Sequence, residues 1–391
     1  MNKSRIKKVI RVFLFLAAMA VVVSCGKKDD KQNNTAEITP TASPKETEVA
    51  NEGLKDAFKD EFLIGSAVNS NNFSDKYMME FITKQFNTVT MENEMKPDSL
   101  LDHDKSIKAA DKLPEINTEK LGMILSNAKS NGLLVHGHTL VWHSQTPDWL
   151  FYEDYDSSKD YVNKKTMLKR MEAFIKKVLT FCKEEYPGVV YAYDVVNEAV
   201  ADGESSLRKD SPWYQIIGED YIEYAFKYAR KYAEPEMKLI LNDYNCYDTK
   251  KCLMLCSTAK KLKEKGYLDA VGMQTHISMD SPEIYMIEFA MEKFSEIEGM
   301  EIQLTEVDMH NTDNSEEGLR KQAERYKELF SMIMEMKRSS KANITSVTFW
   351  GLCDSMTWLT NFRKETSYPL LFDKNLQPKP AYFSVMEAAA Q

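Results

Sequence analysis

The sequence predicts a single (β/α)8 barrel, and three observations support this fold class. From residue 54 onwards, short apolar runs rich in β-branched residues alternate with longer stretches of helical periodicity. There are eight such runs, which is the number that closes a parallel barrel covered by helices. Polar, aromatic and histidine side chains follow these runs, at the strand ends that would meet on one rim. A doubly wound sheet would not gather all eight ends around one cavity.

The first 24 residues have the pattern of a lipoprotein signal peptide. A basic segment precedes the apolar run Val12–Val23, which is too short for a bilayer span of about 20 residues. The run ends at Ser24-Cys25, as in a bacterial lipobox, whose cysteine receives the lipid. We therefore expect an exported protein that is lipid-anchored through Cys25 to a bacterial membrane, at the outer membrane or the cell surface. The alternative is an ordinary secretory signal with a coincidental cysteine.

Residues 25–53 are expected to form a disordered tether, because they contain no aromatic residue and hardly any large aliphatic one. One folded domain would then occupy residues 54–391. The chain carries a net charge of −9, and residues 1–24 hold five basic residues and no acidic one, so the charge without them is −14. Such an acidic protein would repel phosphates, so we expect no nucleic-acid partner and a neutral or cationic substrate.

The elements of the barrel can be placed in order along the chain. The eight expected strands are Phe62–Val68, Asn87–Met91, Leu133–Val141, Val189–Val196, Met237–Leu241, Ala270–Gln274, Glu301–Thr305 and Ser346–Trp350. Each is a run of apolar, β-branched or aromatic residues, which is typical of buried parallel strands. The clearest helices between them are Tyr161–Lys183, Tyr221–Tyr232, Thr249–Lys265 and Glu316–Lys337, which are amphipathic and rich in Lys, Glu, Leu and Met.

The residues in and just after these strands carry the chemical signal. In strand order they are Glu92-Asn93, then His136, His138, Trp142 and His143, then Asn197-Glu198, Asn242-Asp243-Tyr244, Gln274 and His276, Glu306 and Asp308, and Trp350. Glu198 and Glu306 come from the fourth and seventh strands and would oppose each other across the mouth. Glycoside hydrolysis needs two such carboxyl groups, one protonated and one ionised.

The five cysteines of the expected domain suggest either a metal site or buried thiols. They are Cys182, Cys246, Cys252, Cys256 and Cys353. Their spacing lacks the C-x-x-C pairs of zinc sites, and no histidine lies between the middle three. We therefore expect reduced, buried thiols and no metal.

Nine segments together make the sequence similar to a known family. They are TMENEMKPDSL, HGHTLVWHSQTPDWL, YAYDVVNEAV, SPWYQIIGEDYI, LILNDYN, VGMQTHI, LTEVDMH, FWGLCDSMTWL and PLLFDKNLQPKPAY. In this order and spacing, the chain from about residue 54 to residue 389 resembles glycoside hydrolase family 10, whose typical activity is endo-β-1,4-xylanase. The resemblance implies a (β/α)8 catalytic domain that acts on xylan and xylo-oligosaccharides without a cofactor.

The resemblance also implies roles for individual residues. Glu198 matches the acid/base, Glu306 the nucleophile, and Asn197 the residue that binds the sugar 2-hydroxyl. His276 and Asp308 match the groups that keep the nucleophile ionised, and His276 also lies within reach of the sugar. The remaining matches in the substrate-binding site are Asn93, Lys96, His138 and Gln274 as polar groups, and Trp142, Trp350 and Trp358 as an aromatic cage. Stacked aromatic walls with a few hydrogen bonds suit sugar rings.

Several residues allow two interpretations. Lys96 could be a solvated loop charge instead of a substrate-binding group. His143 could either orient a neighbouring group or contact the sugar. Tyr244 could form a wall on the leaving-group side. Trp149 and Trp213 are expected to be structural, and His103 and His310 have no expected role. Cys353 and Met356 depart from the family pattern and put the loop after the eighth strand, and so the sugar preference, in doubt.

The sequence therefore predicts a monomeric, retaining endo-β-1,4-xylanase that needs neither metal nor organic cofactor. One rival is another β-1,4-glycanase with the same site, because glucose differs from xylose by one hydroxymethyl group. A second rival is a lipoprotein that captures glycans for a transporter. Such a binder would not need two opposed carboxylates.

Overall fold

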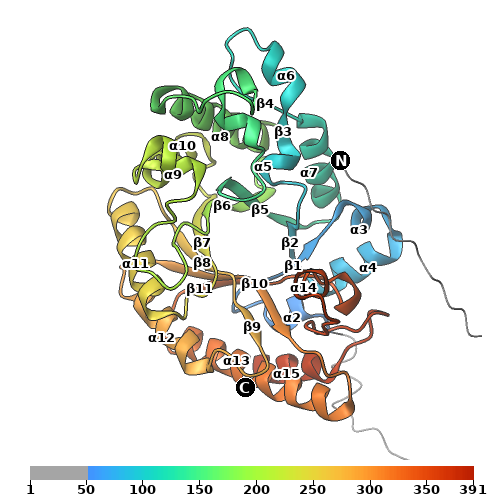
Figure 1. The fold of residues 1–391 in the computed structure, drawn as a ribbon. Coiled ribbons are helices and arrows are strands. Elements are labelled where there is room, and N and C mark those ends of the chain that lie inside the picture. Colours follow the sequence, from blue (N-terminus) through green and yellow to red (C-terminus); the bar gives the residue numbers. More distant parts are fainter. Residues whose placement is uncertain (1–51) are drawn as a thin grey trace, which may run out of the picture. The chain divides into compact units, whose positions relative to one another are not determined.

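The computed structural model describes residues 52–391, which form the predicted barrel (Figure 1). The eight barrel strands are β1 (Leu63–Val68), β2 (Thr88–Met91), β5 (Leu134–Trp142), β6 (Val190–Asn197), β7 (Lys238–Asp243), β8 (Ala270–Met273), β10 (Glu301–His310) and β11 (Ile344–Phe349). They pair in parallel in the order β11-β1-β2-β5-β6-β7-β8-β10, and β10 pairs with β11 to close the ring. The predicted fold class is confirmed.

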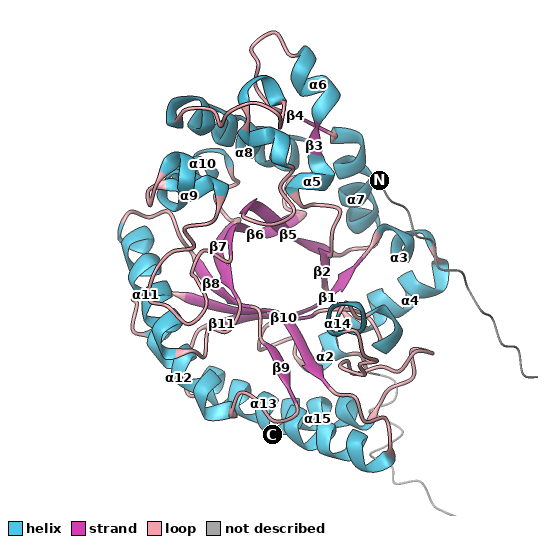
Figure 2. Ribbon diagram, in the orientation of Figure 1, coloured by secondary structure: helices cyan, strands magenta, loops and turns pink. Residues whose placement is uncertain are grey.

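One long helix follows each strand and packs on the outside of the ring (Figure 2). In chain order these helices are α4 (Lys76–Gln85), α7 (Thr118–Ser130), α8 (Lys164–Glu185), α10 (Tyr221–Tyr232), α11 (Thr249–Glu264), α12 (Ile284–Ser295), α13 (Glu316–Arg338) and α15 (Pro380–Ala389). Their buried faces are apolar, so the main core lies between the helices and the strands.

Shorter helices and strands lie in the segments that connect the barrel strands to the long helices, and one short helix precedes β1. They are the helices α2 (Leu54–Ala57), α3 (Ser70–Ser74), α5 (Pro97–Leu100), α6 (His103–Lys108), α9 (Pro212–Ile217) and α14 (Leu359–Arg363), the 3-10 turns Asp148–Phe151, Glu153–Tyr155 and Asp354–Met356, and the strands β3 (Leu101–Asp102), β4 (Glu115–Ile116) and β9 (His276–Ser278). Strand β9 adds to the outer end of β10.

The predicted strand bounds agree with the structure to within two residues, except at the end of the seventh strand. That strand, β10, continues to His310 because its last residues pair with β9, where Asp308 lies opposite His276. The first predicted helix, α8, begins at Lys164 rather than at Tyr161. Asn163 caps it, because its side chain accepts a hydrogen bond from the backbone N–H of Thr166 at 3.0 Å.

Side chains fill the interior of the barrel, so the fold is not a pore. On the helix side of the sheet, Gly137 in β5 is required by the packing of Tyr193, because a Cβ atom at that position would lie 2.4 Å from the Tyr193 ring. Tyr191 reaches across the interior, and its hydroxyl lies 3.1 Å from that of Ser346 on β11. A filled interior leaves the C-terminal ends of the strands as the place for a site.

Residues 1–51 lie outside the described part of the chain, so the expected signal peptide, Cys25 and nearly all of the expected tether remain predictions. Between residues 52 and 391, no helix is long and apolar enough to cross a membrane. The same range holds no cluster of three or more His, Cys, Asp or Glu side chains placed to bind a metal. Its five cysteines form no disulfide bond.

Candidate active site

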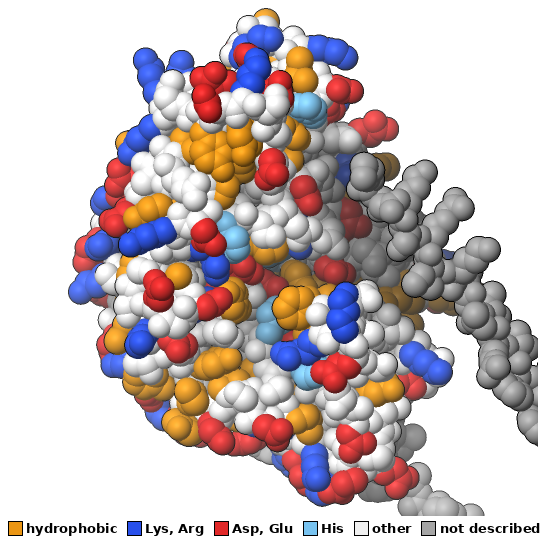
Figure 3. All heavy atoms as spheres, viewed as in Figure 1, with side chains coloured by type: hydrophobic (Ala, Val, Ile, Leu, Met, Phe, Trp, Pro, Cys, Tyr) orange, Lys and Arg blue, Asp and Glu red, His pale blue; other side chains and the backbone are white. Residues whose placement is uncertain are grey.

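The two predicted carboxylates lie at the C-terminal end of the barrel. Glu198 follows β6 directly, and Glu306 lies within β10, three strands further around the ring. Figure 3 shows that charged side chains of both signs surround this face, while acidic, histidine and hydrophobic side chains meet near its middle. Glu198 has a φ of 55°, in the left-handed region that residues other than glycine seldom adopt. Such backbone strain is typical of functional positions.

Glu306 is buried, with 4% of its surface exposed, and donors surround its carboxylate. One oxygen accepts from Asn242 Nδ2 at 2.9 Å, and the other lies 3.2 Å from His276 Nε2. The other ring nitrogen of His276 is 2.9 Å from Asp308 Oδ1. Trp358 Nε1 donates to the second oxygen of Asp308 at 2.9 Å. The nucleophile-support residues of the sequence prediction are therefore brought together.

Electrostatics in this group favour an ionised Glu306. Burial acts to lower the pKa of His276, but the charge of Asp308 and the hydrogen bonds to Asp308 and Glu306 outweigh it and raise the pKa to about 10. His276 is therefore a cation at neutral pH. Burial acts to raise the pKa of Glu306, but the hydrogen bond from His276 and the charges of His138 and His276 hold it below its ordinary value.

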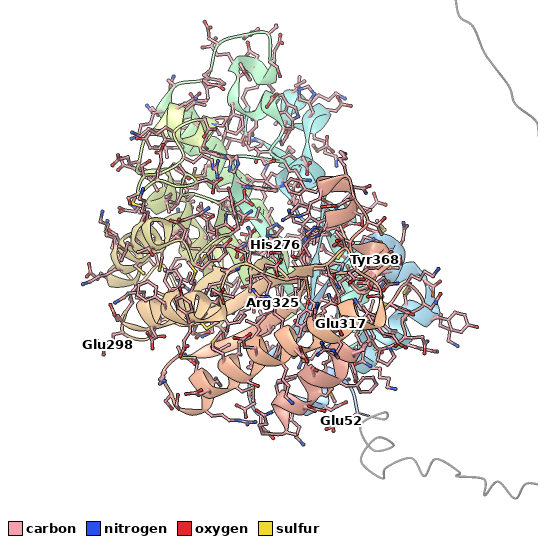
Figure 4. The ribbon with its side chains drawn as sticks, turned by 60° about the horizontal axis from the view of Figure 1, so that its bottom comes forward. Glu52, His276, Glu298, Glu317, Arg325 and Tyr368 are labelled. Carbon is pink, nitrogen blue, oxygen red and sulfur yellow. The ribbon has the colours of Figure 1, made fainter. Side chains whose placement is uncertain are left out.

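The position of His276 depends on two neighbouring elements. His276 is the first residue of β9. The backbone carbonyl of Ser278, two residues later in the same strand, accepts a hydrogen bond from Arg325 Nε of α13 at 2.8 Å. Figure 4 shows His276 at the end of the barrel, with Arg325 below it on the helix. The short strand is thus fixed both by pairing with β10 and by a hydrogen bond from a guanidinium group.

Glu198 has different neighbours. Trp142 Nε1 donates to one oxygen at 2.9 Å, and Gln274 Nε2 donates to the other at 3.2 Å. His143 Nε2 lies 3.8 Å from the first of these oxygens. Burial and the charge of Arg208 outweigh the charge of Glu198, so the pKa of His143 is lowered and the ring is neutral at pH 7. The side chains that contact the Glu198 carboxyl are thus neutral, whereas Glu306 has a cationic partner in His276.

Three side-chain amides connect the two carboxyl groups. Asn197 Oδ1 accepts from Asn242 Nδ2 at 3.0 Å and from Gln274 Nε2 at 3.2 Å. Asn242 also donates to Glu306, and Gln274 also donates to Glu198. Thr305 Oγ1 donates to Asn242 Oδ1 at 2.7 Å, which fixes the orientation of that amide. The amide chain holds both glutamates in one rigid network.

The floor of the site is a carboxylate between two histidines. Asp194 on β6 lies 2.8 Å from His136 Nε2 and 2.8 Å from His138 Nδ1, and all three side chains are buried. Burial acts to raise the pKa of Asp194, but His136 and His138 outweigh it and hold the pKa below its ordinary value. This anchoring fixes the ring of His138 beside Trp350, whose ring centroid is 5.4 Å away.

A second polar group lies beside Trp142. Lys96 Nζ is 2.7 Å from Gln145 Oε1 and 3.3 Å from Asn93 Oδ1, and it lies 5.0 Å from the centroid of the Trp142 ring. Lys96 is only 6% exposed, so the interpretation as a solvated loop charge is wrong. Burial lowers its pKa, although the charges of Glu306 and nearby Glu92 act against this shift.

The five tryptophans of the described chain fall into two groups. Trp350 and Trp358 face His276 at centroid distances of 6.5 and 5.1 Å, and Trp142 borders Glu198. Trp213 is buried and donates to the backbone oxygen of Trp142 at 3.0 Å, while Trp149 packs on Tyr155 away from this group. Trp142 and Trp358 thus contact carboxylates of the site, Trp350 lies beside its two histidines, and Trp149 and Trp213 pack outside this group.

Sequence reasoning missed several members of the site. Asp194 lies in mid-strand and Gln145 in a loop, so neither had a positional signal. Asn242 was recognised only as the end of a strand, and Glu92 only as the neighbour of Asn93. Burial, followed by the charge of Glu94, raises the pKa of Glu92 despite the opposing charge of Lys96. The arrangement can hold a neutral polar ring between aromatic walls and place one ionised carboxylate opposite a second carboxyl group.

Comparison with known proteins gives one consistent result. The sequence model described as glycosyl hydrolase family 10 matches residues 53–388. Endo-1,4-beta-xylanase B of Butyrivibrio fibrisolvens is 42% identical over 340 residues, covering 86% of this chain and 53% of the relative. Endo-1,4-beta-xylanase A of Thermotoga maritima is 41% identical, covering 85% of this chain and 30% of the relative. The chain therefore spans about half or less of these relatives.

Solved structures agree with this comparison. The CBM22-1 and GH10 modules of a Clostridium thermocellum endo-1,4-beta-D-xylanase, complexed with xylohexaose, superpose with a TM-score of 0.79 at 38% identity, covering 87% of this chain and 68% of that one. An intracellular xylanase of Thermoanaerobacterium saccharolyticum, in the form of a mutant complexed with xylotriose, gives a TM-score of 0.75 at 38% identity, covering 85% and 98%.

Proposed function

The chain belongs to glycosyl hydrolase family 10, and on this premise we propose that it is a retaining endo-1,4-β-xylanase that cleaves internal bonds of xylan. The observation that carries the proposal is the contrast between its two carboxyl groups. Glu306 is buried against the cationic His276, whereas Glu198 is bordered by neutral donors. Retaining hydrolysis requires this division between an ionised nucleophile and a proton donor.

The reaction proceeds in two steps. Ionised Glu306 attacks the anomeric carbon, and the bond to the leaving oxygen breaks while Glu198 gives that oxygen its proton. The product of this step is a glycosyl-enzyme. Glu198, now ionised, removes a proton from water, and the resulting hydroxide displaces Glu306 from the anomeric carbon. Two inversions give net retention, and a carboxyl separation of about 5–5.5 Å is expected for this geometry.

The remaining residues bind and orient the sugar. Asn197 binds the 2-hydroxyl beside the reacting carbon, and His138, Gln274 and His276 surround the same ring. Asn93 and Lys96, which already contact each other, bind the next xylose. The apolar faces of these rings pack on Trp142, Trp350 and Trp358. Tyr244 forms the wall on the leaving-group side.

Product analysis tests the proposal. The purified domain is incubated in parallel with xylan and with a soluble β-1,4-glucan, and the products are separated by chromatography. We expect a ladder of xylo-oligosaccharides from xylan, with β-anomers formed first in the proton NMR spectrum. Faster cleavage of the glucan would assign the other glycanase activity, and α-anomers formed first would exclude the retaining mechanism.

We further propose that the protein is exported and lipid-anchored through Cys25 to a bacterial membrane, at the outer membrane or cell surface. The support is the sequence alone, in which a basic segment and a short apolar run precede Ser24-Cys25. Residues 25–53 would tether the domain to the membrane. One chain supplies every residue of the proposed site, so the proposed enzyme needs no second copy for catalysis and is proposed to act as a monomer.

A further inference from the structure

A buried lysine lies next to the segment that carries Glu198. Lys251, in the first turn of α11, is 1% exposed. Its Nζ is 2.8 Å from Asp243 Oδ1 and 3.2 Å from Asp202 Oδ1. It also lies 3.5 Å from the centroid of the Tyr244 ring, which is a close cation–π contact. Burial acts to lower the pKa of Lys251, but the charge and hydrogen bond of Asp243 outweigh it and raise that pKa, while burial raises the pKa of Asp243 to about 7 against the opposing charge of Lys251.

Asp243 links this lysine to the backbone around Glu198. Its Oδ2 accepts from the N–H of Val200 at 3.2 Å, and its Oδ1 accepts from the N–H of Tyr244 at 2.9 Å. The N–H of Glu198 itself donates to the carbonyl of Asn242 at 2.9 Å. The backbone on both sides of Glu198 is thus attached to the end of β7, and this attachment holds its left-handed conformation.

The same charges hold the ring of Tyr244. Its hydroxyl donates to Asp202 and accepts from Arg208 Nη2 at 3.0 Å. Arg208 Nε in turn donates to the backbone carbonyl of Glu198 at 3.3 Å. Lys251 therefore contacts both aspartates and the tyrosine of a network that ends at the backbone of Glu198, although it has almost no exposed surface with which to touch a substrate.

We propose that Lys251 is a positioning residue for the leaving-group half of the reaction. It fixes the Glu198 carboxyl through Asp243, and it fixes the wall for the departing sugar by holding Tyr244. The inference rests on the proposed function. The partners of Glu306 include Asn242, His276 and, through Asp308, Trp358. The ion pairs and the cation–π contact of Lys251 are instead with Asp243, Asp202 and Tyr244. Loss of Lys251 therefore damages proton donation and leaving-group binding, while nucleophilic attack is preserved.

The test compares two leaving groups in the variant Lys251→Met. One substrate is xylotetraose, whose sugar leaving group needs both the proton of Glu198 and a binding wall. The other is an aryl xylobioside with an acidic phenol, which needs neither. We expect kcat/KM to fall about 10- to 100-fold for xylotetraose, as for a slightly misplaced catalytic group, and less than about threefold for the aryl substrate.

A matched control removes another buried ion pair. Lys379 is 4% exposed and lies 2.9 Å from Asp354, which follows β11, three strands around the ring from β7. Lys379 contacts Asp354 and not the residues on the leaving-group side. Any loss of kcat/KM in Lys379→Met should therefore be the same factor for both substrates. Calorimetry of both variants shows whether each is folded at the assay temperature.

Each outcome decides the proposal. Equal losses on the two substrates in Lys251→Met, or an unchanged rate on xylotetraose, would overturn the role of Lys251 alone. A wild-type protein that cleaves neither substrate would refute the proposed function and the role of Lys251 with it. If Lys251→Met does not fold, Asp202→Asn at a half-exposed position replaces it in the same test. This variant should also lose more kcat/KM on xylotetraose than on the aryl substrate, by a smaller factor than expected for Lys251→Met.

Discussion

Glu198 and Glu306 carry the same chemical group, and in the proposed mechanism their different neighbours decide which one attacks. Glu306 has a cation, an amide donor and burial around it, and Glu198 has an indole and an amide. Substitution of each glutamate should therefore produce a different kinetic defect, which makes the assignment testable at the level of single residues.

Glu306→Ala should abolish activity on every substrate, because no glycosyl-enzyme can form without a nucleophile. Glu198→Ala should lower kcat on xylan about 10²- to 10⁴-fold, the range of general acid–base assistance. With an aryl xylobioside it should still give a burst of phenol, since an acidic phenol departs without a proton. Stopped-flow absorbance measures the burst, and steady-state assays on xylan measure the loss.

Azide provides the control for this assignment. It needs no deprotonation and fits the space left by the Glu198 side chain, so it should restore turnover of the aryl substrate in Glu198→Ala and yield a β-glycosyl azide. An α-glycosyl azide from Glu198→Ala, or a β product rescued in Glu306→Ala, would reverse the two roles.

His276→Gln should move the acidic limb of the pH profile to higher pH. The pKa of Glu306 lies below its ordinary value partly because of the His276 cation, and glutamine keeps a donor but removes the charge. The pKa of Glu306 therefore rises, and Glu306 is protonated at a higher pH. The measurement is kcat/KM for the aryl xylobioside as a function of pH, which depends on ionised Glu306.

The matched variant is His143→Gln. His143 lies 3.8 Å from Glu198 and is not among the hydrogen-bond partners of Glu306, so the substitution leaves the His276 cation beside Glu306 in place. We expect its acidic limb to coincide with that of the wild type. An acidic limb that stays in place in His276→Gln would show that the cation does not keep Glu306 ionised.

At the scale of elements, the strands were more predictable than the contacts between them. Parallel strands are buried on both faces and read as continuous apolar runs, so nearly all of their bounds could be placed to within two residues. The three-residue strand β9 could not be predicted, because a segment so short has no periodicity and forms only by pairing with β10. The extension of β10 beyond Thr305 depends on the same pairing.

The candidate site was predictable in part for a similar reason. Strand ends locate Glu198, Glu306, His276 and Asp308, because a barrel brings those ends together. Partners from mid-strand or from helices cannot be located in this way. Lys251 is one of two adjacent lysines in an amphipathic helix, a pattern that normally indicates a solvated face, and only the fold shows that it is buried.

Asn163→Ala should destabilise the domain by about 1 kcal/mol through α8 alone. The side chain of Asn163 is exposed, and its structural task is to accept the N–H of Thr166 in the first turn of a 22-residue helix. Denaturant unfolding followed by circular dichroism measures the loss, and kcat on xylan should not change. Asn163→Asp keeps the cap and should recover most of the stability; equal loss in both variants would contradict capping as the cause.

At the scale of the whole molecule, the proposed anchor determines where the enzyme works. Cys25→Ser should leave the protein without lipid and release it from membranes on fractionation, with kcat on soluble xylo-oligosaccharides unchanged. Mass spectrometry of the N-terminal peptide detects the acyl chains. A wild-type protein without lipid, together with a variant that stays in the membrane fraction, would refute the lipobox assignment.

A xylan chain has two different ends, and the mouth of this barrel has two different sides. Beyond the amides that they share, Glu198, the proposed proton donor, is linked through Arg208 to Tyr244, which directly follows β7, whereas Glu306 is linked through His276 to β9 and through Asp308 to Trp358. Under the proposed function, a xylan chain would lie across the mouth in one direction only, with its reducing end toward Tyr244. The fragment with the original reducing end leaves in the first step, while the other fragment stays bonded to Glu306 until water arrives. A label on the reducing end would thus report the first departure, and a label on the opposite end the second.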